Sequence, residues 1–165
     1  MVFVIDGTIH SIKKPSIHQE EFYRPDKKCH FITTQLLVDF DGNIIAATTN
    51  YPGRIHDSVI ARRCNLFKEI CGKFYAIADP GFNNVDFCVA GFRPSSIAKM
   101  KGKDNYEDYK TFDSISRSEQ VIVENINSHI KVFKCLSEKF RHLLTGAVFI
   151  CCGLYNWKRS LGYYQ

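Results

Sequence analysis

Three acidic side chains in this sequence stand where they could meet and do chemistry. Asp6 follows the short apolar run MVFVI, and Asp79 follows another such run, FYAIA. Glycine comes soon after each acid, in DGT and DPGF, and a glycine turn can hold a carboxylate at a sheet edge. If the two runs form neighbouring strands, both carboxylates meet at one edge. There they would repel each other unless a divalent cation lay between them.

The third acid, Glu124, is singled out by helical geometry. Ile122 and Ile126 each flank it by two positions, so it faces away from the apolar side of a helix. Seven-residue spacing also places Arg117, Glu124 and Lys131 nearly in line. Two small polar residues lie on the same side: Asn127 and Ser128. An acid between two bases could bind a metal and touch phosphates.

Phosphodiester hydrolysis is the chemistry that these acids would serve. The reaction needs an activated water and a stabilised leaving oxygen, which two Mg²⁺ ions about 4 Å apart supply. Mg²⁺ prefers oxygen ligands and keeps several waters, so three carboxylates suffice. The predicted cofactor is therefore a divalent cation, Mg²⁺ or Mn²⁺.

Each candidate also has an ordinary structural interpretation. An acid before glycine at the end of a strand is usually a turn residue, and Glu124 could be a solvated helix residue. His56-Asp57-Ser58 should open a helix, and we favour an N-cap role for Asp57 or Ser58. The residues alone leave these alternatives open.

Hydrophobic patterns predict a mixed α/β sheet with covering helices. The expected strands and helices follow chain order. Strands are expected at 1–5, with a possible continuation over 8–12 after a kink, and at 30–40, 43–50 and 74–78. Helices are expected at 56–71, 114–142 and 147–157, with a strand as the alternative for the last. Loops are expected at 13–28 and 91–113, with a short helix inside the second as an alternative. Asp41-Gly42 is a strong hairpin signal, so the first three strands should form an antiparallel meander.

The bulk composition indicates one ordinary globular domain over residues 1–165. The net charge of +5 fits an anionic partner without proving one. Seven cysteines without a CxxC motif indicate reduced thiols that act mostly as small core residues. No signal peptide or membrane-spanning stretch is expected.

The order of several motifs resembles the endonuclease domain of Harbinger-type DDE transposases and of nucleases derived from them. The matching segments run along nearly the whole chain: Ile5-Asp6-Gly7-Thr8, Lys14-Pro15, Tyr23, Lys28-x-His30, Gln35, Asp39, Tyr51-Pro52-Gly53, His56-Asp57-Ser58, Ala78-Asp79-Pro80-Gly81-Phe82, Arg117, Val123-Glu124, Ile130-Lys131 and Phe140-Arg141. This collinearity is more specific than any single motif. Pro80 and Phe82 depart from the Ser and Tyr usual in the family.

The resemblance implies an RNase H-like fold, with three antiparallel strands followed by a parallel one. It implies that Asp6, Asp79 and Glu124 bind the catalytic metal and that His56 and Asp57 support the site. Family members cut DNA at transposon ends and join the 3′ hydroxyl to a target. They normally carry an N-terminal DNA-binding segment, so the resemblance predicts that this segment is missing here and that a separate DNA-binding partner is needed. A homo-oligomer and a nuclear location, or a cytoplasmic and nuclear one, are further expectations.

Several basic residues are candidate phosphate contacts, although each could equally be a solvated surface residue. They are Lys99, Lys101, Lys103, Arg117 and Lys131. Two other functions remain open beside that of an active DNA nuclease. The chain could be a silent, domesticated relic that binds DNA or protein, or an RNase H-like nuclease acting on RNA or hybrids.

Overall fold

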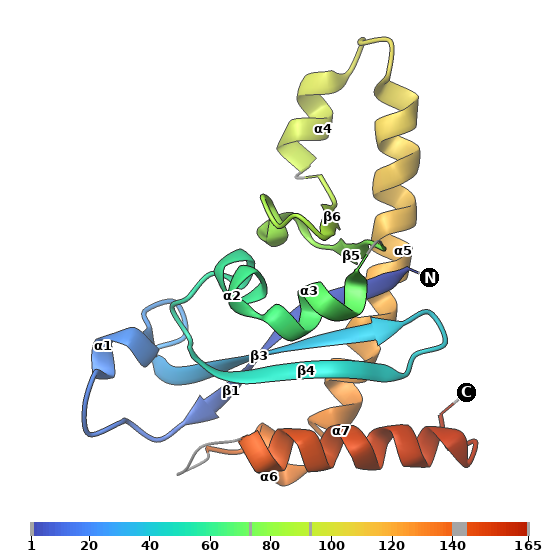
Figure 1. Ribbon diagram of the computed structural model, residues 1–165. Helices are drawn as coiled ribbons and strands as arrows, with labels where there is room; N and C mark the ends of the chain where they lie inside the picture. The colour runs from blue at the N-terminus through green and yellow to red at the C-terminus, as the bar shows by residue number, and fades with distance from the viewer. Residues whose placement is uncertain (1, 73, 93, 140–144, 165) are drawn as a thin grey trace.

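In the computed structural model, which describes residues 2–72, 74–92, 94–139 and 145–164, the described chain forms a six-stranded mixed sheet (Figure 1). The strands are β1 (Phe3–Ile12), β2 (Tyr23–Arg24), β3 (Cys29–Asp39), β4 (Ile44–Pro52), β5 (Ala76–Ala78) and β6 (Cys88–Ala90). Their order across the sheet is β2-β3-β1-β5-β6, and β4 also pairs with β3. Three long strands are antiparallel and the strands that follow are parallel, which confirms the predicted mixed α/β fold class.

The antiparallel meander forms as predicted. β1 pairs with β3 from Phe3 opposite Asp39 to Ile12 opposite His30, and β3 pairs with β4. The Asp-Gly turn joins β3 to β4, with Gly42 at a φ of 81°, a conformation that glycine adopts without strain. Asp39 fixes this turn because its carboxylate accepts the backbone amide of Asn43 at 2.8 Å.

The continuation over 8–12 that the sequence left open is confirmed, although β1 does not stop at Asp6 and its pairing with β3 is unbroken there. It continues to Ile12, and Thr8 and His10 are buried although they are polar. The reason is the length of β3, which supplies a hydrogen-bonding partner for every residue up to Ile12. Asp6 is therefore held in the middle of a paired strand.

Eight helical segments are present in the part of the chain that the structure describes. They are α1 (Gln19–Phe22), α2 (Asp57–Arg63), α3 (Asn65–Cys71), the 3-10 turn η1 (Pro80–Phe82), α4 (Pro94–Met100), α5 (Tyr106–Ile130), α6 (Lys134–Ser137) and α7 (Thr145–Ser160). The helix predicted at 147–157 is confirmed as α7. No helix in these described segments is both long and apolar enough to cross a membrane.

Three helix predictions need correction. The helix expected at 56–71 is two helices, because the backbone of Cys64 leaves the helical region with a ψ of 90°. The loop expected at 91–113 contains α4 and the first turns of α5. The helix expected at 114–142 ends at Ile130, and its residues 140–142 lie outside the described residues. The apolar repeat misled the last prediction, because Phe133 and Leu136 enter the same core after the chain has turned.

Both faces of the sheet are covered, as Figure 1 shows, by α2 and α3 on one side and by α5 and α7 on the other. Neighbouring residues of one strand therefore enter different cores. Val4 packs with Val123 and Val148, whereas Ile5 packs with Phe67. Alternate residues of a strand are thus buried on opposite faces of the sheet, which explains why the strands are apolar on both faces. α4 and the first half of α5 form a helical hairpin that projects away from this layered body (Figure 1).

Candidate active site

Asp6 and Asp79 lie side by side because their strands are parallel neighbours in register. Ile5 pairs with Ala78, and each is followed directly by its acid. The predicted meeting of the two acidic positions at one place on the sheet is therefore confirmed. Asp79 also caps η1, since its Oδ1 accepts the backbone amide of Gly81 at 2.8 Å. Pro80 begins that turn without an amide hydrogen, so it suits this position.

Helix α5 brings a polar face to Asp6. Asn127 donates a hydrogen bond from Nδ2 to Asp6 Oδ2 at 2.9 Å. Glu124 lies nearly one helical turn before Asn127 and is exposed, whereas Lys131 lies about one turn after it and is half-buried. The sequence placed these three residues on one side of the helix, and the structure turns that side toward β1. Ser128 instead bonds to the Glu124 carbonyl.

Electrostatics show how closely the acids approach one another. Burial, together with the negative charges of Asp79, Asp57 and Glu124, raises the pKa of Asp6 to about 7, while a hydrogen bond from the Gly7 amide opposes the rise. Burial also raises the pKa of Asp79, again with Asp57 adding to the rise. Asp57 therefore acts on both strand acids. A crowd of carboxylates with few nearby positive charges is the situation that a divalent cation relieves.

Asp57 is the residue whose place the sequence described least well. The N-cap interpretation of Asp57 and Ser58 was wrong, because α2 begins at Asp57 and its N-cap residue is His56. Gln35, which is completely buried, donates from Nε2 to the Asp57 carbonyl at 2.9 Å and to its Oδ1 at 3.2 Å. A side chain at Gly7 would overlap the Asp57 carboxylate. The glycine after Asp6 is thus required by the close approach of Asp57.

His56 itself is exposed, and its side chain makes no capping hydrogen bond. Its support of the site remains a prediction.

The donor set suits a hard divalent cation, because every candidate ligand is a carboxylate oxygen. Among the described residues, no three His, Cys, Asp or Glu side chains are drawn together tightly enough to form a metal cluster as they stand. The acids therefore match a divalent cation in the chemistry of their oxygen atoms and in lying in one region of the fold. All seven cysteines are free thiols, and none belongs to this set of acids.

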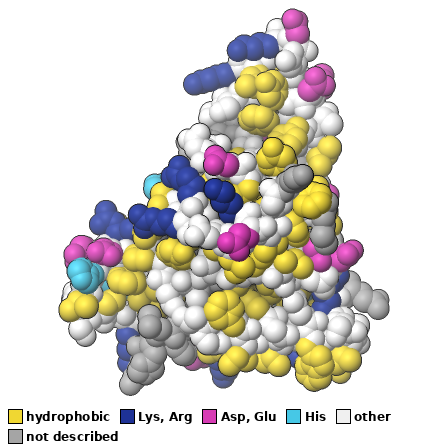
Figure 2. Space-filling view, in the orientation of Figure 1, with side chains coloured by type: hydrophobic (Ala, Val, Ile, Leu, Met, Phe, Trp, Pro, Cys, Tyr) yellow, Lys and Arg dark blue, Asp and Glu magenta, His cyan; other side chains and the backbone are white. Residues whose placement is uncertain are grey.

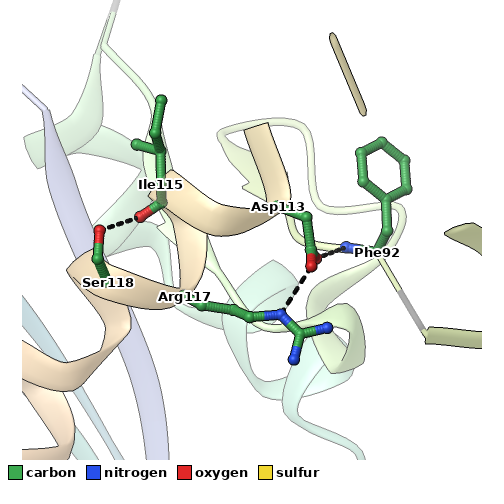
Figure 3. A network of polar contacts seen from close by, with 5 residues as sticks. All are labelled: Phe92, Asp113, Ile115, Arg117 and Ser118. Atoms are coloured by element: carbon green, nitrogen blue, oxygen red, sulfur yellow. Dashed lines mark hydrogen bonds and ion pairs between the residues drawn. The ribbon is translucent and has the colours of Figure 1, made fainter. Parts of the chain in front are cut away.

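Arg117, a predicted phosphate contact, makes an ion pair within its own helix. Its Nε donates to Asp113 Oδ2 at 2.7 Å, and Asp113 Oδ1 accepts the backbone amide of Phe92 at 3.3 Å (Figure 3). Ser118 donates to the Ile115 carbonyl in the next turn. Asp113 is buried and joins the base of the projecting hairpin to α5, so this pair has a structural role. The Arg117 side chain is still 57% exposed, so a phosphate contact remains a prediction.

The other lysine candidates lie far from the acids. Lys99 is near the end of α4, and Lys101 and Lys103 are in the turn before α5. Glu124 is 18 residues beyond Tyr106 along α5, which is about 27 Å at 1.5 Å per residue. Lys and Arg side chains are visible near the tip of the hairpin in Figure 2. A phosphate contact by these lysines remains a prediction, and it would lie well away from the acids.

The layered sheet and its acids define a class: an α/β domain that presents carboxylates from two parallel strands and a covering helix. The chain belongs to the DDE superfamily endonucleases, whose family model matches residues 5–156. It is also similar to the probable transposase for insertion sequence element IS702 of Microchaete diplosiphon, with 28% identity over 165 residues. That match covers 96% of this chain, and the chain spans 57% of the relative's length. No solved structure gave a significant match.

These comparisons confirm the family that the motif order predicted. Endonucleases of this superfamily generally use divalent metal ions, in agreement with the oxygen-rich set of side chains around Asp6.

Proposed function

We propose that this chain is the catalytic domain of a transposase-type nuclease that cuts DNA with the help of Mg²⁺ or Mn²⁺. The observation that carries the proposal is the pairing of Ile5 with Ala78, which makes Asp6 and Asp79 neighbours, while Glu124 on α5 lies near enough for its charge to raise the pKa of Asp6. Acids from three separate parts of the sequence thus share one region of the fold.

Asp6, Asp79 and Glu124 would hold the cation, which when bound supplies neutralisation of charge at the phosphate and a more acidic water. The chain's own groups orient these acids. Asn127 holds one oxygen of Asp6, and the Gly81 amide holds one oxygen of Asp79. Each carboxylate is thereby presented in a fixed direction, which lowers the cost of organising the site.

DNA is the proposed substrate, because the family and the basic surface both favour a polyanion. We further propose that the domain joins the 3′ ends of cut DNA to a target, and that a separate DNA-binding protein or a second copy of the chain assists it. His56, Asp57, Arg117, Lys131 and the hairpin lysines are the proposed accessory residues.

The test is nicking of supercoiled plasmid by the purified chain with Mg²⁺, Mn²⁺ or EDTA. Metal-dependent nicking is expected, and Asp6→Ala, Asp79→Ala and Glu124→Ala should each abolish it while leaving the circular dichroism spectrum intact. Nicking that survives one substitution removes that residue from the triad. A folded chain that binds DNA but never nicks it, with or without an added partner, would instead support the non-catalytic binding module.

A further inference from the structure

A half-open cavity of about 310 Å³ adjoins the acids at Gly7 and Asp57. It continues along β1 and reaches Arg24 on the short strand β2. Neither the triad nor the ion pairs of the hairpin account for this cavity. Its position, directly next to the residues proposed to act on a phosphodiester, makes its lining informative.

The cavity is lined by small and hydroxyl-bearing residues, two isoleucines, two bases and one acid. They are Gly7, Thr8, Thr33, Gly53, Ile9, Ile55, Arg24, Lys131 and Asp57. Small residues and hydroxyls of this kind allow a sugar–phosphate backbone to approach the protein main chain closely. A cavity of this volume receives the backbone of one strand but not a whole duplex.

The two bases in the lining are Lys131 and Arg24. Lys131 is half-buried, and burial lowers its pKa while the nearby charge of Asp6 opposes that effect. Arg24 donates through Nε and Nη2 to the two carboxylate oxygens of Asp26, each at 3.2 Å. Because Asp26 is largely exposed, this ion pair contributes little to stability. A phosphate presents the same forked acceptor geometry as a carboxylate, so it can replace Asp26 on the guanidinium.

We propose that this cavity binds the backbone of the DNA strand next to the cut, with Arg24 as a phosphate ligand that Asp26 occupies until DNA arrives. The inference rests on the proposed nuclease function, and it specifies the path of the bound DNA strand across the protein. The bound strand runs from the acids, over Gly7 and Thr8, toward β2. Arg24 and Asp26 then control DNA affinity in opposite senses.

The experiment measures binding of a fluorescent DNA duplex and of the matching single strand to the whole chain in EDTA, from 50 to 200 mM KCl. Losing one phosphate contact flattens the slope of log affinity against log salt by about 0.9 for duplex DNA and about 0.7 for a single strand. Arg24→Ala should show these changes and weaken binding roughly tenfold, as expected for one charge-assisted hydrogen-bonded contact. Asp26→Ala should tighten binding, because it leaves Arg24 available.

Matched controls come from α3, where Lys68 and Glu69 are exposed and do not line the cavity. Lys68→Ala should leave the salt slope unchanged, and Glu69→Ala should tighten binding less than Asp26→Ala does. The proposal is overturned if Arg24→Ala keeps the wild-type slope, or if Asp26→Ala and Glu69→Ala behave alike. Normal DNA binding by wild type in those cases leaves the nuclease proposal standing, whereas a wild-type chain that binds no DNA refutes both. Thermal melting confirms that each variant is folded.

Discussion

At the scale of single residues, Asp6 links the stability of the fold to its proposed function. Its pKa is raised from 3.8 to about 7, first by burial and then by the neighbouring acids. A carboxyl group with a raised folded-state pKa stabilises the fold when it is protonated. That contribution is fully present below pH 3.8 and is lost as the pH rises through about 7. Near neutral pH without a cation, the charged form of Asp6 therefore destabilises the fold.

Asp6→Asn should remove this pH dependence. Without divalent ions, the melting temperature of wild type should fall between pH 5 and pH 8 more steeply than that of the variant, by about 2–4 °C for each kcal/mol of charge penalty. Adding Mg²⁺ at pH 8 should raise the wild-type melting temperature and leave the variant nearly unchanged. Scanning calorimetry at both pH values makes the measurement. Parallel profiles of melting temperature against pH for the two proteins would show that ionisation of Asp6 does not destabilise the fold.

Gln35 offers a second prediction at the residue scale, because it is the group that holds Asp57 beside the strand acids. Gln35→Met keeps most of the side-chain volume but removes both hydrogen bonds. Loss of such an orienting partner should reduce Mg²⁺ affinity about 10- to 100-fold, measured by calorimetric titration, with a matching loss of nicking at limiting Mg²⁺.

Urea unfolding distinguishes this effect from general damage to the fold. Asp57→Asn should reproduce the loss of metal affinity if Asp57 carries the effect. Unchanged Mg²⁺ affinity in both variants would show that the hydrogen bonds between Gln35 and Asp57 only stabilise the start of α2.

At the scale of elements, the α4–α5 hairpin is predicted to contact DNA away from the cut. Lys99→Ala/Lys101→Ala/Lys103→Ala should weaken DNA binding and flatten its salt slope by up to about 2.7, if all three lysines touch phosphates. Nicking at saturating DNA should remain close to wild type, because the acids lie about 27 Å along α5. Fluorescence anisotropy and plasmid nicking separate the two effects. Equal losses in binding and in saturated nicking would place the hairpin in the catalytic step instead.

The elements also show which parts of the fold the sequence could predict. Strands with apolar runs, such as those before Asp6 and Asp79, were found, and the Asp-Gly turn correctly predicted that β3 and β4 pair antiparallel. β1 was cut short because pairing with β3, which is a tertiary effect, carries the polar residues after Asp6. The hairpin was missed because α4 and the start of α5 mix charged residues with Pro and Gly and show no clear apolar period.

The site was predictable to a similar extent. Asp6 and Asp79 were located by strand ends, and Asn127 by helical spacing. Asp57 was named as a supporting residue only through the family resemblance, and Arg24 was not named, because their neighbours come from segments far apart in the sequence. Gln35, a polar residue in the apolar run FITTQLLVD, was a local sign that a polar partner, here Asp57, lies against this strand.

Burial of Leu136 in the core, after the chain has left α5, is the proposed reason why that helix ends at Ile130. Leu136 is fully buried, with its backbone carbonyl accepting a hydrogen bond from the buried ring of His10 at 2.9 Å. Leu136→Ala should lower the free energy of unfolding by about 2–5 kcal/mol. Val132→Ala, at a side chain that is 76% exposed in the same junction, should change it by less than about 0.5 kcal/mol. Urea denaturation compares them, and similar values for the two would contradict this account.

At the scale of the whole molecule, both faces of the sheet pack against helices, and the acids lie where β5 ends beside β1. Ile5 and Val4 are neighbours in sequence, yet they bind the sheet to different helical layers. Asp6, the next residue, accepts a hydrogen bond from Asn127 of α5 and directly follows the last residue of β1 that pairs with β5. The position of the acid therefore depends on the packing of the complete domain.

The hairpin between Asp79 and Glu124 leaves the body of the domain and returns to it at a base fixed by Asp113, which bonds to both Phe92 and Arg117. Chain beyond that base can grow, shrink or be exchanged without moving either acid. Such a place is where natural selection, or a protein engineer, could attach a new recognition segment without altering the proposed active site. Replacing residues 95–110 with a shorter helical hairpin would then alter which DNA is chosen and leave the reaction itself in place.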